Sequence, residues 1–284
     1  MAEIPGTNSV SMPPEPIALR RTVRVGVCPT DKADAQASGA ERRRNGLAGI
    51  PPADGWAAHH EIDVECVGAP DPQTGYLVGI QDIDAAVRRH AVGVLRDGAA
   101  RGDVPPATVP AAIAAAIAHA LPAGAPVRSV RWRPGPFVSY TWERRMPDHA
   151  LLAERFEFSA AHRLHCPQLS DEENRRTFGK CNHPSGHGHN YRVEVEVAVP
   201  TGPAAPPMTA AALEAIVMRE VIDRFDHRHL NADCAEFAAL NPSVENIARV
   251  CHGLLDAPVR SGGARLRRVT VWETEKTSAT YPAE

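Results

Sequence analysis

The sequence lacks the features of membrane, secreted and nucleic-acid-binding proteins. No apolar run approaches the roughly 20 residues that span a bilayer, and the first residues lack the basic and apolar regions of a signal peptide. The six cysteines form no Cys-x-x-Cys pair, which indicates reduced thiols and a cytoplasmic protein. A formal net charge of -3 provides no electrostatic basis for binding nucleic acid or an anionic membrane. We therefore expect neither partner.

What the chain does contain is alternating and helical apolar patterns in its second half, residues 150–284. Its 284 residues suit one large domain or two smaller ones, and the first sixteen residues resemble a disordered tail. The helix patterns have plausible caps, Thr209 at the start of the first helix and Ser243 at the start of the second. The expected order is strands at 154–162 and 187–199, helices at 209–225 and 243–256, a strand at 265–273 and a final short strand, joined in part by a polar loop at 165–186.

The first half, residues 17–146, repeats this order. Strands are expected at 22–28 and 60–66, helices at 80–94 and 109–121, and a strand at 127–132, with a long loop at 31–55. A repeat of more than 100 residues indicates a duplicated domain rather than a solenoid. The prediction is an α+β protein of two tandem ββααββ units, divided near Met146–Ala150, each with an antiparallel sheet and two helices on one face.

Three histidines in the second half have the spacing of a metal site. His187 and His189 are two residues apart in an alternating run, so both point to the same face of a strand. His162 ends another strand-like run of the same parity. Three imidazoles with one open position are typical of catalytic zinc. A surface cluster of histidines is the alternative.

Other reactive groups lie close to these histidines in the sequence. Cys181 precedes His187 by six residues, and a thiol beside a metal should have a lowered pKa and could act as a base or nucleophile. Asp226 next to His227 could tune a proton carrier, although adjacent side chains rarely pair directly. Glu273 ends a strand, a position that suits a ligand-anchoring acid. An inert thiol, a helix-end pair and an edge-strand carboxylate are the structural alternatives.

Several ordered motifs resemble the 6-pyruvoyltetrahydropterin synthase family, which includes the 6-carboxytetrahydropterin synthases of queuosine-type biosynthesis. The resemblance covers about residues 154–281. The motifs are Phe158-Ser-Ala-Ala-His162, Gly179-Lys-Cys181-Asn-x-Pro-x-Gly-His187-Gly-His189-Asn-Tyr191, Asp226-His227-x-x-Leu230-Asn231, Asn241-Pro-Ser243-x-Glu245-Asn-Ile-Ala248 and Glu273-Thr274.

The resemblance implies a T-fold, whose subunits assemble barrels with active sites at their interfaces, and a zinc-dependent lyase acting on 7,8-dihydroneopterin triphosphate. It implies a Zn²⁺ cofactor and a homo-oligomer, in which three tandem chains could replace six. The implied metal ligands are His162, His187 and His189, the implied catalytic residues are Cys181, Asp226 and His227, and the implied substrate contacts are Glu273, which would anchor the pterin, and Ser243. Arg175, Arg176 and Lys180 could receive the triphosphate or belong to a solvated loop.

The product is less strongly indicated than the substrate. Five residues separate Cys181 from the His-Gly-His run, a spacing that favours 6-pyruvoyltetrahydropterin and loss of triphosphate. The alternative is 6-carboxytetrahydropterin synthase on the same substrate. A non-catalytic tandem T-fold that binds a pterin or purine is a further alternative, against which the complete set of proton-carrying residues argues.

The first repeat lacks most of these residues. By position, Pro29 falls near the place of His162, Ala58 at that of His187, and His60 at that of His189. Pro134 falls near the place of Glu273, and nothing resembles Asp226-His227. We therefore expect a T-fold without zinc, which serves as a barrel partner or as a wall of the other half's site.

Overall fold

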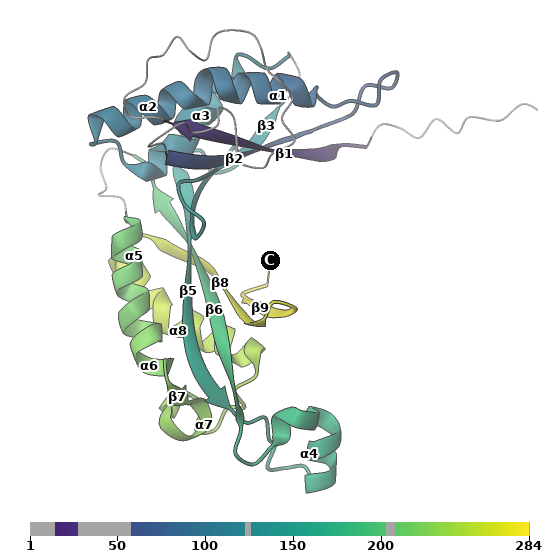
Figure 1. Cartoon of the computed structure of the whole chain (residues 1–284), viewed down its shortest axis with the longest axis vertical. Coiled ribbons are helices and arrows are strands. Elements are labelled where there is room, and N and C mark those ends of the chain that lie inside the picture. The colour runs from purple at the N-terminus through teal and green to yellow at the C-terminus, as the bar shows by residue number, and fades with distance from the viewer. Residues whose placement is uncertain (1–14, 28–57, 123–125, 203–207, 284) are drawn as a thin grey trace, which may run out of the picture.

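A computed structural model describes residues 15–27, 58–122, 126–202 and 208–283, which form a mixed α+β structure. One antiparallel sheet runs through both halves of the chain in the order β1-β2-β3-β4-β5-β6-β8-β9, and short β7 adds to β5 in parallel. Figure 1 shows the sheet curving between the two halves, with helices beside each. No helix in the described ranges has both the length and the apolar character needed to cross a membrane.

The second half has the strands and helices expected from its apolar patterns. Thr209 and Ser243 cap α5 and α8, as the sequence predicts. A π-helical turn at Met218–Ile222 carries α5 into α6. The elements are β5 (His149–His162), β6 (His187–Pro200), α5 (Ala210–Val217), α6 (Asp223–Phe225), β7 (Arg228–His229), α7 (Leu230–Asp233), a 3-10 turn (Ala235–Phe237), α8 (Val244–Ser261), β8 (Arg265–Thr274) and β9 (Thr277–Tyr281).

The segment expected to be a loop at 165–186 instead contains helix α4 (Asp171–Phe178) and a 3-10 turn (Gly179–Asn182). Ser170 and Glu173 form a capping box that fixes the start of α4. Fully buried Asn174 holds the helix by accepting from the Cys166 amide and donating to backbone carbonyls, including that of Leu169. The loop prediction was wrong here because polar side chains, rather than an apolar face, stabilise this helix.

The first half repeats the main order of two strands, two helical stretches and two strands, without described counterparts of α4, β7 and α7. A π-helical turn (Val87–Ala91) again joins two helical segments, and fully buried Ile83 and Ile113 face the core. The described elements are β1 (Ile17–Val27), β2 (Ala58–Gly68), α1 (Ile80–Ala86), α2 (Val92–Arg101), a 3-10 turn (Pro106–Thr108), α3 (Val109–Ala118), β3 (Val127–Arg133) and β4 (Val138–Glu143). Residues 1–14 of the expected tail and the expected loop at 31–55 lie outside the described residues.

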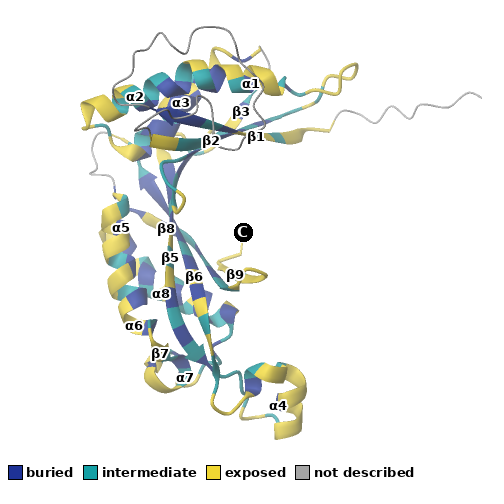
Figure 2. Cartoon of the chain, viewed as in Figure 1, coloured by how far each residue is buried: buried dark blue, intermediate teal, exposed yellow. Residues whose placement is uncertain are grey.

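The predicted division near Met146–Ala150 falls at a hairpin turn. β4 pairs with β5 from Val138 opposite Glu154 to Trp142 opposite Ala150, so the sheet continues across the division. The core follows the sheet in the same way, as the run of buried residues between sheet and helices shows (Figure 2). Burying each large aliphatic side chain contributes about 1.5–3 kcal/mol, so this shared core stabilises both halves together.

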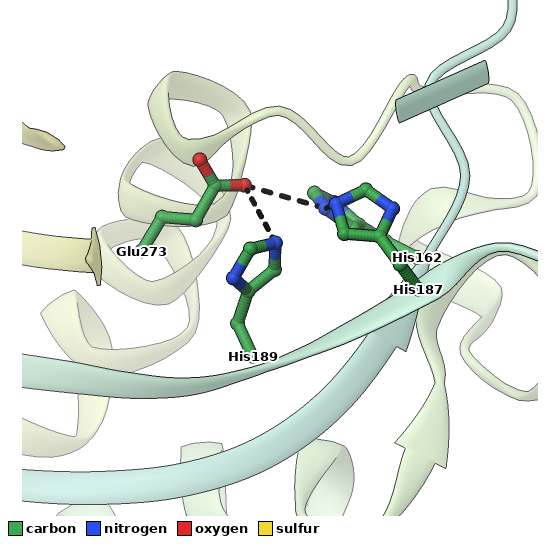
Figure 3. Close-up of side chains that lie close together, drawn as sticks. All are labelled: His162, His187, His189 and Glu273. Carbon is green, nitrogen blue, oxygen red and sulfur yellow. Dashed lines mark hydrogen bonds and ion pairs between the residues drawn. The ribbon is translucent and has the colours of Figure 1, made fainter. Parts of the chain in front are cut away.

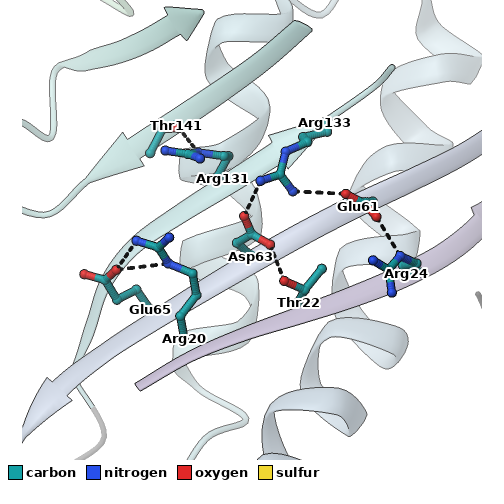
Figure 4. Close-up of polar contacts among 9 residues, drawn as sticks. All are labelled: Arg20, Thr22, Arg24, Glu61, Asp63, Glu65, Arg131, Arg133 and Thr141. Carbon is teal, nitrogen blue, oxygen red and sulfur yellow. Dashed lines mark hydrogen bonds and ion pairs between the residues drawn. The ribbon is translucent and has the colours of Figure 1, made fainter. Parts of the chain in front are cut away.

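The face of the sheet turned away from the helices is polar. In the first half, Asp63 is 5% exposed and accepts hydrogen bonds from Thr22 and Arg133 (Figure 4). Glu61 bridges Arg133 and Arg24. Residues that alternate with these point to the helices and are apolar, so the period of two separates an ion-paired face from a packed face.

Candidate active site

The three predicted histidines meet at one end of the paired strands β5 and β6. His162 lies directly opposite His187 in the strand register, and His189 lies opposite Ala160. All three therefore face the same side as Phe158, the side that packs against the helices. The period of two in the sequence, together with antiparallel pairing, brings the three imidazoles together.

Glu273 on β8 completes the cluster (Figure 3). The His162 Nε2 atom lies 3.3 Å from His187 Nε2 and 3.3 Å from Glu273 Oε1. The His189 Nε2 atom lies 3.5 Å from the same Glu273 oxygen. One donor atom from each of the four residues lies within 4.8 Å of the others. The sequence analysis kept Glu273 apart from the metal ligands, whereas the structure places its carboxylate among them.

This donor set fits a zinc ion. Ligands bound at ~2.05 Å in a tetrahedron lie about 3.3–3.4 Å from one another, and the separations from His162 and Glu273 match that edge. Burial lowers the pKa of His187 and His189, which favours the neutral imidazoles that metals bind. His189 Nε2 is also buried without a hydrogen-bond partner.

Two backbone features that sequence reasoning missed hold the cluster in place. The Pro242 carbonyl, just before α8, lies 2.7 Å from His162 Nδ1, so Nδ1–H donates to it and Nε2 faces the other histidines. Gly186 has a φ of +69°, and a Cβ there would lie 2.7 Å from the His162 carbonyl oxygen. Gly186 was visible in the motif. The contact of His162 with the Pro242 carbonyl, 80 residues away, has no local sequence signal.

Cys181 lies in the 3-10 turn beside the end of β5, where its carbonyl accepts from the Leu164 amide. Burial and the nearby Glu273 carboxylate raise the pKa of the Cys181 thiol. The pKa shift predicted from the sequence had the opposite direction, because that prediction included a cation beside the thiol. A divalent cation held by the histidines would lower that pKa and oppose both effects.

Asp226 and His227 pair directly, contrary to the expectation that neighbouring side chains rarely do so. His227 Nδ1 lies 2.8 Å from Asp226 Oδ2, and His227 has a φ of 57°. The main chain of Ser159 on β5 fixes the pair, because its amide donates to Asp226 and its carbonyl accepts from the His227 amide. These hydrogen bonds, first that from Ser159 and then that from His227, lower the pKa of Asp226.

The pair of Asp226 and His227 makes no direct contact of this kind with the other predicted site residues. Among the described residues, no hydrogen bond or ion pair connects Asp226 or His227 to Cys181 or to the histidine cluster. The His227 side chain is 82% exposed. Ser243 caps α8 by accepting from the Asn246 amide, so its hydroxyl has a structural role, and its substrate role stays a prediction. Arg175, Arg176 and Lys180 lie exposed on and after α4.

The strand register locates the corresponding positions in the first half. Val27 lies opposite Ala58 as His162 lies opposite His187, and His60 corresponds to His189. The position of His162 is therefore taken by Val27 and not by Pro29, which lies outside the described residues. Across the sheet, Val64 pairs with Val130 as Val193 pairs with Val271. Two residues further along β3 and β8 stand Trp132 and Glu273, so the earlier alignment of Pro134 with Glu273 was wrong by two positions.

These four first-half positions hold no metal-binding set. Trp132 Nε1 donates to His60 Nδ1 over 3.2 Å, so the imidazole that remains is bound to an indole. His60 and Trp132, together with Val27 and Ala58, line a cavity of about 590 Å³. The other walls of this cavity come from α2, α3 and the segment between them. Within the described part of the first half, no cluster of three or more potential metal ligands occurs.

Comparisons with known proteins find relatives of the second half of the chain. The family model described as 6-pyruvoyl tetrahydropterin synthase matches residues 151–284. The human 6-pyruvoyl tetrahydrobiopterin synthase is 38% identical over 136 residues, which are 48% of this chain and 92% of that protein. The Drosophila melanogaster protein of the same description is 44% identical over 103 residues, 35% of this chain and 60% of that protein.

A solved 6-pyruvoyl tetrahydropterin synthase from Caenorhabditis elegans aligns with 36% identity and a TM-score of 0.44, over 48% of this chain and 96% of that one. The sequence match to the human enzyme spans nearly the whole of that relative. Through residues 151–284, this chain belongs to the 6-pyruvoyl tetrahydropterin synthase family.

Proposed function

We propose that this protein is a zinc-dependent lyase that converts 7,8-dihydroneopterin triphosphate to 6-pyruvoyltetrahydropterin with release of triphosphate. The observation that carries the proposal is the cluster of His162, His187, His189 and Glu273 in a half that is 38% identical to the human 6-pyruvoyl tetrahydrobiopterin synthase. Bound zinc would supply Lewis acidity to the hydroxyl-bearing side chain of the substrate. The three histidines would hold it.

Cys181 is the proposed base. Its thiol lies close enough to Glu273 for the carboxylate to influence its pKa, which supports a position at the edge of the cluster. As a thiolate it would take a proton from the carbon beside a substrate hydroxyl, and triphosphate would then leave. General base catalysis of this kind contributes about 10²–10⁴-fold in rate.

Asp226 and His227 are the proposed proton relay. The Asp226 carboxylate orients the imidazole through Nδ1, which leaves Nε2 to exchange protons. The main chain of Ser159 on β5 holds the pair. The His227 side chain is 82% exposed, so its imidazole is accessible to a substrate bound by a neighbouring copy. This supports an active site at an interface between T-folds.

Glu273 is the proposed anchor of the pterin ring. A carboxylate that accepts two N–H donors from the edge of a pterin gives a charge-assisted, directional contact. The hydrogen bond with His162 is the main cause that lowers the pKa of Glu273, which favours the ionised side chain that accepts such donors. Ser243 is the weaker proposed contact, since its hydroxyl also caps α8.

The tandem arrangement is proposed as two T-folds in one sheet, of which the first is degenerate. Its support is the repeated order of elements and the matching register of the two strand pairs. The strands along the main path alternate in direction, so β9 of one copy could pair antiparallel with β1 of the next and close a barrel. Because β4 pairs with β5, such a barrel contains an even number of T-folds, in a homo-oligomer of tandem chains.

The test is incubation of the zinc-loaded protein with 7,8-dihydroneopterin triphosphate, followed by identification of the products. Triphosphate and 6-pyruvoyltetrahydropterin in equal amounts would support the proposal. Release of acetaldehyde with 6-carboxytetrahydropterin would assign the other branch of the family. Binding without release of triphosphate would leave only a pterin-binding protein.

A further inference from the structure

Tyr191 carries a buried hydroxyl with no partner. The residue is 0% exposed, and its hydroxyl oxygen makes no hydrogen bond to the described protein atoms. A buried polar group without a partner destabilises the fold, and a phenylalanine of the same shape would avoid that cost. An unpaired hydroxyl in such a position therefore calls for a partner that arrives with a ligand.

The hydroxyl lies at the candidate site. The Tyr191 ring centroid is 5.5 Å from that of His189 and 6.0 Å from that of His162, and its inner face stacks on Phe158 at 5.1 Å. The unpaired oxygen belongs to a ring that contacts two of the three proposed metal ligands, so a ligand bound at the histidine cluster would lie beside this side chain.

The first half provides an internal control for this position. Ile62 lies opposite Val23 and Trp132 on neighbouring strands, as Tyr191 lies opposite Phe158 beside Glu273. Ile62 is also 0% exposed, so the fold packs an aliphatic side chain here without difficulty. The tyrosine accompanies the histidine cluster, while the half without the cluster has no polar atom at this position. The hydroxyl is therefore not a requirement of the fold.

We propose that the Tyr191 hydroxyl is a substrate-binding group, which donates a hydrogen bond to an oxygen or ring-nitrogen acceptor of the pterin substrate beside the histidine cluster. The proposal rests on the proposed function, because it takes the pterin as the ligand. A neutral donor beside the histidines fixes the substrate's position relative to them. It also excludes ligands that place an apolar group there, since they would leave the hydroxyl unpaired.

Tyr191→Phe tests the proposal in the full-length, zinc-loaded chain. To prevent turnover, the dissociation constant for 7,8-dihydroneopterin triphosphate is measured in Cys181→Ala and in Cys181→Ala/Tyr191→Phe. We expect the constant to rise about tenfold, with unchanged zinc content and an unchanged or higher Tm without substrate, because an unpaired hydroxyl has been removed. An equal constant in the two variants would overturn the proposal, and so would loss of zinc, which would make the hydroxyl a support for the histidines.

Tyr140→Phe is the matched control. Tyr140 is also buried, but it lies on β4, and its hydroxyl oxygen accepts from the Ala210 amide. Removing that hydroxyl should lower the Tm and leave substrate binding unchanged. If Cys181→Ala itself does not bind the pterin, the proposed function fails. If it binds and Tyr191→Phe has no effect, only the role of Tyr191 fails.

Discussion

The two halves of the chain share the order of their main strands and helices and the register of corresponding strand pairs, yet they present different chemistry at the same place. In the second half, three imidazoles and a carboxylate lie close together at the ends of strands β5, β6 and β8. In the first half, the corresponding positions hold Val27, Ala58, His60 and Trp132 around an apolar cavity. The comparison teaches that the backbone provides the meeting point, and that four side chains decide whether it can hold a metal.

The largest expected effect comes from replacing each of the two corresponding histidines by alanine. His189→Ala should weaken zinc binding by at least about 100-fold, because it removes a donor atom from the cluster. His60→Ala should leave the zinc content unchanged, because its imidazole is bound to Trp132. Zinc per chain after dialysis measures both. An equal loss in the two variants would abolish the distinction between the halves.

The next effect concerns the thiol beside the cluster. Cys181→Ala should lower turnover by about 10²–10⁴-fold and leave zinc content near that of the unaltered protein, because we propose the cysteine as a base and not as a ligand. Cys166→Ala, which changes another partly exposed cysteine before α4, should retain activity. Rates of triphosphate release, measured with zinc content, check both. Loss of zinc from Cys181→Ala would make the thiol a ligand.

Glu273 is compared with Trp132 at the corresponding position. Glu273→Gln should weaken binding of the pterin triphosphate by about 10–100-fold, since it removes charge-assisted hydrogen bonds worth about 1.5–3 kcal/mol. Trp132→Phe should leave that binding unchanged. Calorimetric titration of zinc-loaded protein gives the affinities. If Glu273→Gln instead released the metal, the carboxylate would be a fourth ligand, as the 3.3 Å separation from His162 would allow.

The smallest effect is on stability, at the junction of the halves. Burial and the charge of Glu214 raise the pKa of Glu154 to about 7 from the ordinary 4.5. Because the folded chain holds this proton more tightly, the stability is fully present below pH 4.5 and is lost as the pH rises through about 7. The loss is about 1–3 kcal/mol. Glu154→Gln should therefore raise the Tm at pH 8 more than at pH 5.

Exposed Glu157 on the same strand is the control for this measurement. Glu157→Gln should change the Tm little at either pH, because its carboxylate is solvated in both states. Thermal unfolding followed by circular dichroism at the two pH values compares the variants. An equal gain for Glu154→Gln at both pH values would show that the carboxyl does not titrate in this range.

Much of the fold and of the candidate site could be predicted from local patterns. The strands that carry His162, His187 and His189 follow from a period of two, and the helices from a period near four with capping at Thr209 and Ser243. Helix α4 was missed because Asn174 and the capping box, rather than an apolar stripe, hold it. The signal for Tyr191 was present, since it shares the alternation of His187 and His189.

Other features depend on pairing between distant segments. The correspondence of Trp132 with Glu273 follows from the strand register, which residue spacing along the chain does not determine. Asp226 contacts His227 where the backbone of His227 has a positive φ. A hydrogen bond from the His227 amide to Ser159 on β5 stabilises this backbone. The Pro242 carbonyl reaches His162 across 80 residues of chain.

The sequence by itself determined the residue types of the site and the face on which each lies, because spacing along a strand fixes side-chain direction. Only the tertiary structure decided that Glu273 lies among the histidines, that Asp226 and His227 pair with each other, and that the Tyr191 hydroxyl has no hydrogen-bond partner among the described residues. The physical reason is that distances between strands depend on register and packing across the whole sheet, which no local pattern contains.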